Sequence, residues 1–292
     1  MFGRPHGYTT LPYSEFRRAL EAMLRSAATA TMVHGLAEFD VTEARRLIAR
    51  RQRETGDRPS FAAFIVHCLA RAIEENKSMQ ACRKGRRHLV VFDDVDVSIV
   101  VEREHHGGKQ PIIHIVRAAN RKTFEEIHRE IREAQKEPLE TAWNGFTTYG
   151  TVELVLLRWL WPVLWRFVRT SPHLHKRYGG TVSVSSLGMF AQGGGWGFPI
   201  TYHTQLTVGG IAQKPVLVNG RVKAREMVDL TLSFDHALIE GAQAARFSAR
   251  LKELVEGAYG LQPPQLKSSP DVEVPAAATT GDGNMARAAQ HK

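Results

Sequence analysis

Cysteine is scarce in this chain. Its 292 residues include only Cys68 and Cys82, too few for the disulfide framework that stabilises small secreted domains. Cys68 lies on an apolar helical stripe, so we interpret it as a small core residue rather than a catalytic thiol. No charged and then apolar secretion signal opens the sequence, so we expect a protein of the reducing cytoplasm.

Long uninterrupted hydrophobic runs are also lacking. The most apolar stretch, residues 152–168, holds three of the five tryptophans, but Arg158, Pro162 and Arg166 interrupt it. It is barely long enough to cross a bilayer, so a membrane span is not expected. Three interpretations remain open for it: subunit or core packing, an amphipathic segment at a membrane surface, or the wall of a substrate channel.

Basic residues outnumber acidic ones and give a net charge of +9, yet we do not expect a nucleic-acid interface. Acidic residues are interleaved with the basic ones, for example in residues 43–54, as on solvated helix faces. The densest basic cluster, residues 83–87, has no neighbouring aromatic side chains on which bases could stack. Such a surface could also attract a polyanionic cofactor or an acidic partner domain.

Apolar periodicity predicts a mixture of strands and helices. Runs that alternate or are continuously apolar predict strands at 30–39, 89–101, 112–116, 181–185, 205–211 and 227–234. Apolar residues at intervals of three and four predict helices at 14–24, 42–53, 61–73, from 124 onward and at 241–256. Thr123 and Glu126 have the spacing of a capping box, and Asn219 with Gly220 predicts a two-residue hairpin turn.

This order of elements predicts a single α/β sandwich, in which helices pack against a sheet. Residues 1–13 form a short N-terminal arm, and residues 14–260 form the domain. From residue 261 to 292 the chain is rich in Pro, Ser, Ala, Thr and Gly without an apolar period. Such a segment cannot bury enough surface to offset its ordering entropy, so a disordered tail is predicted there.

The segment 229–251 contains a candidate catalytic histidine. A buried strand delivers Asp235 and His236 at its end, and a helix begins shortly afterwards. A lone histidine at such a place is commonly structural. Here, however, the carboxylate of Glu240 follows four residues later, and Gly241 then permits a tight turn and a close approach of the backbone. This combination favours a catalytic histidine held on a rigid element.

These residues resemble the catalytic domain of the dihydrolipoamide acyltransferases of 2-oxo-acid dehydrogenase complexes, and chloramphenicol acetyltransferase, whose shared signature is His, three residues, Asp, Gly. The block GGTVSVSSLGMF from Gly179 is similar to that family's GGTFTISNLG, and QLTVGGI from Gln205 is similar to its strand leading to a glycine. Other similar blocks begin at Ser14, Ala37, Phe61 and Asp93. The resemblance covers residues 14–256 apart from about 150–172, which looks like an apolar insertion.

The resemblance implies a chloramphenicol acetyltransferase-like sandwich, a mixed sheet flanked by helices, that forms trimers with the active site between subunits. It implies transfer of an acyl group between coenzyme A and a thiol such as dihydrolipoyl, with no metal. His236 would be the general base, and Ser185 would donate a hydrogen bond to the oxyanion. Glu240 and Arg17 match the family's bracing Asp–Arg pair, although Glu240 is longer than Asp, and Ala237 replaces an arginine common in the dehydrogenase members.

Partners and alternatives follow from the same resemblance. About thirteen residues precede the first matched helix, so a lipoyl group would be carried on a separate chain, or the acceptor would be a small molecule. An isolated trimer is expected because the tail is polar, and assembly of trimers into a cage remains an open alternative. A non-catalytic trimeric or cage-forming scaffold is one alternative, favoured by Glu240 and Ala237. A membrane-surface acyltransferase that uses the apolar insertion is another.

Overall fold

A computed structural model of the chain describes residues 9, 21, 30–85, 87–105, 108–136, 170–187, 193–198 and 201–261. Several predictions lie outside these residues: the N-terminal arm, the helix at 14–24, nearly all of the apolar insertion and all but the first residue of the tail. Within the described ranges, no helix is both long and apolar enough to cross a membrane.

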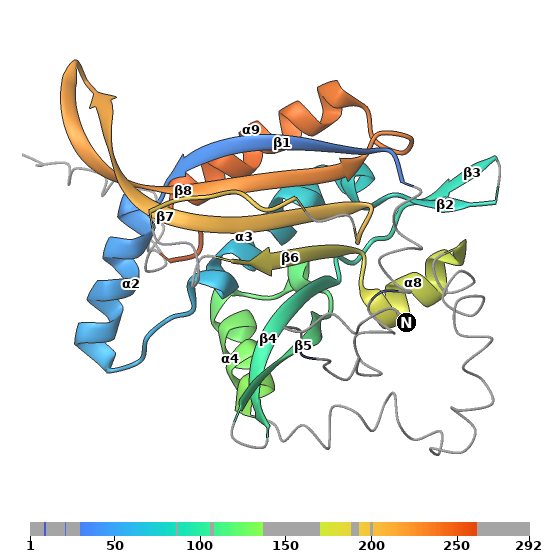
Figure 1. Cartoon of the computed structure of the whole chain (residues 1–292), viewed down its shortest axis with the longest axis horizontal. Helices are drawn as coiled ribbons and strands as arrows, with labels where there is room; N and C mark the ends of the chain where they lie inside the picture. The colour runs from blue at the N-terminus through green and yellow to red at the C-terminus, as the bar shows by residue number, and fades with distance from the viewer. Residues whose placement is uncertain are drawn as a thin grey trace, which may run out of the picture. The chain divides into compact units, whose positions relative to one another are not determined.

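A mixed sheet forms the centre of the fold (Figure 1). In the described residues its six strands lie in the order β1-β8-β7-β6-β4-β5. Their bounds are Met32–Asp40 for β1, Val97–His105 for β4, Gly108–Val116 for β5, Val182–Ser186 for β6, Thr204–Val218 for β7 and Arg221–Asp235 for β8. Strand β6 runs parallel to β4 and β7, and the other neighbours are antiparallel.

Helices cover one face of this sheet (Figure 1). They are α2 (Thr42–Thr55), α3 (Phe61–Glu75), α4 (Phe124–Lys136) and α9 (Gly241–Glu256). Smaller elements are the 3-10 helices η1 (Lys77–Gln80) and η2 (Ala119–Arg121), the helix α8 (Pro172–Gly179) and the hairpin of β2 (Cys82–Lys84) and β3 (His88–Val90). A mixed sheet flanked by helices confirms the predicted α/β sandwich.

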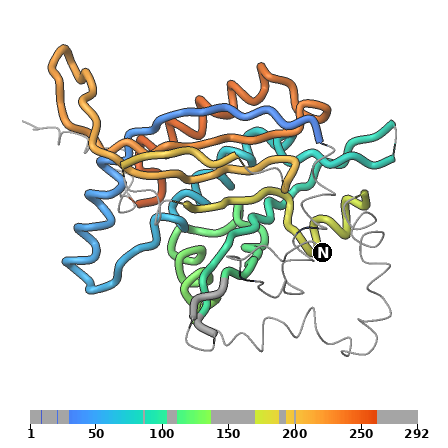
Figure 2. Tube along the Cα trace, viewed as in Figure 1, coloured from blue at the N-terminus to red at the C-terminus, as the bar shows by residue number. Residues whose placement is uncertain are grey.

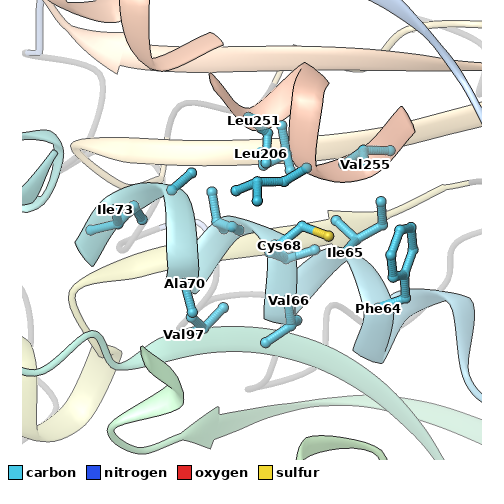
Figure 3. Packing of buried hydrophobic residues seen from close by; sticks show 14 of the residues in the cluster. Phe64, Ile65, Val66, Cys68, Ala70, Ile73, Val97, Leu206, Leu251 and Val255 are labelled. Atoms are coloured by element: carbon cyan, nitrogen blue, oxygen red, sulfur yellow. The ribbon is translucent and has the colours of Figure 1, made fainter. Parts of the chain in front are cut away.

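Helix α3 lies at the centre of the core. Ser60 caps it, because its hydroxyl accepts a hydrogen bond from the Ala63 N–H at 3.3 Å. On the helix-covered face of the sheet, α3 lies between α9 and α4, and Leu251 of α9 and Leu206 of β7 lie near Cys68 in Figure 3. Cys68 is completely buried, and this burial raises the pKa of its thiol far above the usual range. It is a core residue, as predicted.

Local signals also set the start of α4 and the turn between β7 and β8. The Glu126 N–H donates to the Thr123 hydroxyl at 3.3 Å, and the Glu126 carboxylate accepts from the Thr123 N–H at 2.8 Å, which is a capping box. Asn219 and Gly220 both have positive φ, as a two-residue hairpin turn requires. Beyond the pairing with β1, the β7–β8 hairpin projects past the rest of the sheet (Figure 2).

One predicted strand is wrong as a continuous element. The apolar alternation predicted a single strand over 89–101, but β3 ends at Val90 and β4 begins at Val97. Between them the chain turns, and the buried Asp96 accepts hydrogen bonds from Arg117 and from the Ala118 N–H at 2.9 Å each. These contacts with a distant segment break the strand, and alternation alone does not reveal them.

Candidate active site

The face of the sheet away from the helices is lined with polar side chains, and we call it the polar face. Along each strand, core residues alternate with residues that face the other way. Leu230, Leu232 and Phe234 of β8 pack in the core, for example. The polar face is formed by buried polar residues of β4, β6, β7 and β8, which are Ser98, Ser183, Gln205, Thr207, Asp229, Thr231, Ser233 and Asp235.

His236 lies where the sequence predicted, directly after the last residue of β8. Its backbone N–H donates to the Thr31 carbonyl at 2.8 Å, just before β1, so the strand end is tied to its neighbour. The side chain is exposed, and its ring centroid lies 6.2 Å from that of Phe234. The imidazole is therefore carried by a rigid element and is open to a ligand in the single chain.

Asp235 organises the turn that carries His236. Its backbone carbonyl accepts from the N–H groups of Leu238 and Ile239 at 2.9 and 3.0 Å. Its side chain accepts from the Ala237 N–H at 3.1 Å and lies 3.3 Å from Nδ1 of His203. The hydrogen bond with His203 is the largest cause that lowers the pKa of the Asp235 carboxyl, so this group is ionised at neutral pH.

The predicted brace lies beside this turn and is only partly described. Glu240 is the exposed residue that precedes α9, and among the described residues it has no ion-pair partner. Arg17 lies outside those residues. Gly241 is the first residue of α9; it has no positive φ, and a Cβ there would meet open space. Within the single chain, the conformation of this turn therefore does not require a glycine.

Ser185 lies on β6, in the middle of the polar face, and is half-buried. It pairs in register with Thr207 of β7, and Thr207 pairs with Thr231 of β8. Thr231 precedes His236 by five residues along the strand, which corresponds to roughly 16 Å. One chain therefore keeps its own Ser185 and His236 too far apart to hold the same reacting group.

Within the described residues, no group of three or more His, Cys, Asp or Glu side chains is arranged to hold a metal ion. The histidines near the turn instead pack as rings. The ring centroid of His175 lies 5.7 Å from that of His203 and 5.7 Å from that of Tyr202. The candidate site thus comprises the exposed imidazole of His236 at the end of β8 and the Ser185 hydroxyl on β6.

Comparison with known families finds a match along most of the chain. The family model of the 2-oxoacid dehydrogenases acyltransferase (catalytic domain) matches residues 5–143 and 170–262. The chain belongs to this family. The match is interrupted between residues 143 and 170, the region that holds the tryptophan-rich stretch.

Curated acyltransferases and solved structures are similar along most of the chain. The acetyltransferase component of the pyruvate dehydrogenase complex of Staphylococcus epidermidis is 26% identical over 255 residues, which are 85% of this chain and 51% of that protein. The chain therefore spans about half the length of this acyltransferase relative. The cubic core of a pyruvate dehydrogenase complex and the Azotobacter vinelandii dihydrolipoamide acetyltransferase, 20% and 19% identical, each superpose with a TM-score of 0.65 over 87% of this chain and 94% of theirs.

Two residues of this acyltransferase domain were not predicted from the sequence. His203 contacts Asp235 across the β7–β8 pair, and Asp229 in the middle of β8 accepts from the Gly195 N–H at 2.6 Å. Lys214 also reaches Asp229, with 3.1 Å between Nζ and the carboxylate. Asp229 was visible as the charged residue within the otherwise uncharged predicted strand 227–234, which is a signal of a buried partner. His203 had no such signal, because its partner depends on the strand register.

Proposed function

We propose that this chain is an acyltransferase that moves an acyl group between coenzyme A and a thiol such as a dihydrolipoyl group. His236 is the general base that takes the thiol proton, so that the sulfur attacks the thioester carbonyl. The Ser185 hydroxyl donates a hydrogen bond to the oxyanion that forms. When the intermediate collapses, the departing thiolate recovers the proton from His236, and no metal or covalent acyl-serine takes part.

The separation of Ser185 and His236 within one chain carries this proposal. Since the two side chains lie at different places along the polar face, an intact site requires the His236 of one copy to approach the Ser185 of another. We propose a homotrimer in which each interface holds one such site. One structural neighbour is the cubic core of a multienzyme complex, and light scattering on the pure protein would separate a trimer from a cage.

Glu240 is the departure from the family signature that matters most for activity. We propose that it pairs with Arg17 and braces the turn of His236, its longer side chain replacing the usual aspartate. A carboxylate four residues after the histidine is not the sole choice at this position. In the Azotobacter vinelandii acetyltransferase, the residues studied for their role in the catalytic mechanism are a serine, a histidine and an asparagine four residues after that histidine.

The proposed partners follow from the same chemistry. Coenzyme A or acyl-coenzyme A is one substrate, and a separate lipoyl-bearing protein is the macromolecular partner. Both cysteines are free and buried, in keeping with the proposed location in the reducing cytoplasm.

An acyl-transfer assay tests the proposal. The protein is incubated with acetyl-coenzyme A and free dihydrolipoamide, and thioester formation is followed. His236→Ala should lower kcat by roughly 10²- to 10⁴-fold, the usual contribution of a general base, and Ser185→Ala by roughly 10²- to 10³-fold. His88→Ala, an exposed histidine on β3, is the matched control and should keep full activity. Equal transfer by native and His236→Ala protein would contradict the role of His236, and if neither exceeds the rate without protein, a non-catalytic scaffold is supported instead.

Mixing the two inactive variants tests whether the site is shared between copies. His236→Ala and Ser185→Ala proteins are unfolded together, refolded as a mixture and assayed. If each site takes its serine from one subunit and its histidine from the next, roughly a quarter of the sites in a random cyclic oligomer contain both native residues. Recovery of activity near this level supports the shared site, whereas no recovery places both residues in one chain and contradicts the proposal.

A further inference from the structure

The segment just before β7 is bound to the end of β8 at two points. The Asp235 N–H donates to the His203 carbonyl at 2.9 Å, and the two side chains meet with 3.3 Å between His203 Nδ1 and one carboxylate oxygen of Asp235. Both side chains are largely buried, with 15% and 9% of their surfaces exposed. An ionised carboxylate only accepts hydrogen bonds, so Nδ1 of His203 carries the proton.

The other carboxylate oxygen of Asp235 binds the residue that follows His236. It accepts the Ala237 N–H at 3.1 Å, so the residues directly before and after His236 are joined through one carboxylate. The ring of His203 also contacts His175 of α8, with 5.7 Å between the ring centroids. The chain of contacts from α8 to the backbone of His236 is therefore continuous.

We propose that His203 is a positioning residue for the acyl-transfer reaction, which acts through Asp235 and does not touch substrate. Its Nδ1–H fixes the orientation of the carboxylate, and the carboxylate then fixes the Ala237 N–H and the direction in which the His236 ring leaves the strand. Displacement of a reacting group by about 1 Å can cost 10²-fold in rate. This inference rests on the proposed role of His236 as general base.

Two substitutions at the same position separate the hydrogen bond from the packing. His203→Phe keeps a ring and removes the donor, and His203→Asn keeps an N–H donor near the place of Nδ1. His203→Phe should lower kcat by roughly 10- to 100-fold with KM changed by less than about threefold, and His203→Asn should recover most of the loss. Unchanged kcat in His203→Phe, or equal losses in both variants, would overturn the inference.

A double-substitution cycle tests the route through Asp235. If His203 acts only through this carboxylate, His203→Phe should change kcat by less than about threefold when Asp235→Ala is already present. Additive losses would show that His203 acts by another route and would reject the inference.

Amide hydrogen exchange provides a readout that does not need activity. In the intact oligomer, His203→Phe should speed exchange at Ala237 by roughly tenfold or more, while amides inside β8 such as Leu230 keep their rates. His34→Phe is the matched control, because His34 also bonds a polar-face residue, Ser233, at 2.8 Å and has no contact with Asp235 in the described residues. Unchanged exchange at Ala237 would reject the inference. Faster exchange at Ala237 in a protein that shows no His236-dependent acyl transfer would reject the proposed function alone.

Discussion

Strand β8 carries two buried aspartates on the polar face, and they are held in different ways. Asp229 is 1% exposed in the middle of the strand, and Asp235 is 6% exposed at its end. Each carboxylate accepts from the backbone N–H of a neighbouring segment and from a basic side chain. For Asp229 these donors are Gly195 and Lys214, and for Asp235 they are Ala237 and His203.

The basic partners make the difference between the two aspartates. Lys214 bridges Asp229 and Glu38, and these hydrogen bonds raise its pKa, so it is charged at neutral pH. The basic partner of Asp235 is instead a histidine, His203, whose Nδ1 lies 3.3 Å from the carboxylate. Asp229 is thus held by a lysine and by the glycine segment that crosses it, whereas Asp235 is held by a histidine and by the N–H of its own turn.

Glycines complete the packing around Asp229. Gly193, Gly194 and Gly195 all have positive φ and run over the sheet where β7 bulges between Val208 and Ile211. A Cβ on Gly194 would lie 2.9 Å from the Asp229 carboxylate. We therefore predict that changes near Asp229 unfold the protein, whereas changes near Asp235 slow its reaction.

The largest effect is expected from Gly209→Ala, at the bulge. The added Cβ would lie 1.9 Å from the Gly195 carbonyl oxygen and 2.9 Å from the Asp229 carbonyl oxygen. Both are backbone atoms, so the glycine segment must move away, with an expected loss of at least about 3 kcal/mol in the free energy of unfolding. Urea unfolding followed by circular dichroism measures it.

Gly35→Ala is the control for this substitution. Gly35 lies on β1, and its added Cβ would make only an ordinary 3.8 Å contact with the Leu232 carbonyl oxygen. We expect a change of less than about 1 kcal/mol there. Native stability in Gly209→Ala would mean that the glycine segment does not pack on the bulge.

A smaller effect is expected from removing each aspartate in turn. Asp229→Ala leaves the Gly195 N–H and part of the Lys214 charge without a partner, so it should cost about 2–4 kcal/mol of unfolding free energy. Asp235→Ala removes hydrogen bonds at a strand end and should cost about 1–2 kcal/mol of unfolding free energy. Its kcat should fall by more than the loss of folded protein alone would cause. A larger stability loss at Asp235 than at Asp229 would reverse the comparison.

The sequence predicted those features that depend on neighbouring residues. Helix α9 runs from Gly241 to Glu256 as expected, and Thr123 caps α4, because capping and apolar period are local signals. His236 and Ser185 were located by short motifs, and both lie on strands or strand ends of the kind predicted. Their catalytic roles are still proposals.

Features that depend on strand register could not be predicted in the same way. His203 and Asp235 are 32 residues apart, and they meet because β7 and β8 pair with Thr204 opposite Phe234. The separation of Ser185 from His236 follows from the same register. A shift by one residue would turn each of these side chains to the other face of the sheet, and the alternation of apolar residues does not specify which residues stand opposite each other.

The smallest expected effect is on acid stability, and it isolates Asp235. The hydrogen bond with His203 holds the pKa of this carboxyl below its ordinary value of 3.8. A carboxyl whose pKa is lower in the folded state stabilises the fold above the unfolded value, and this contribution is lost as pH falls through the folded value. The free energy of unfolding of the native protein should therefore fall more steeply below pH 3.8 than that of Asp235→Asn.

Urea unfolding of both proteins between pH 5 and 2 measures this difference. If the two curves stay parallel over that range, the carboxylate of Asp235 is not held by His203, and the contrast between the two aspartates loses its electrostatic basis.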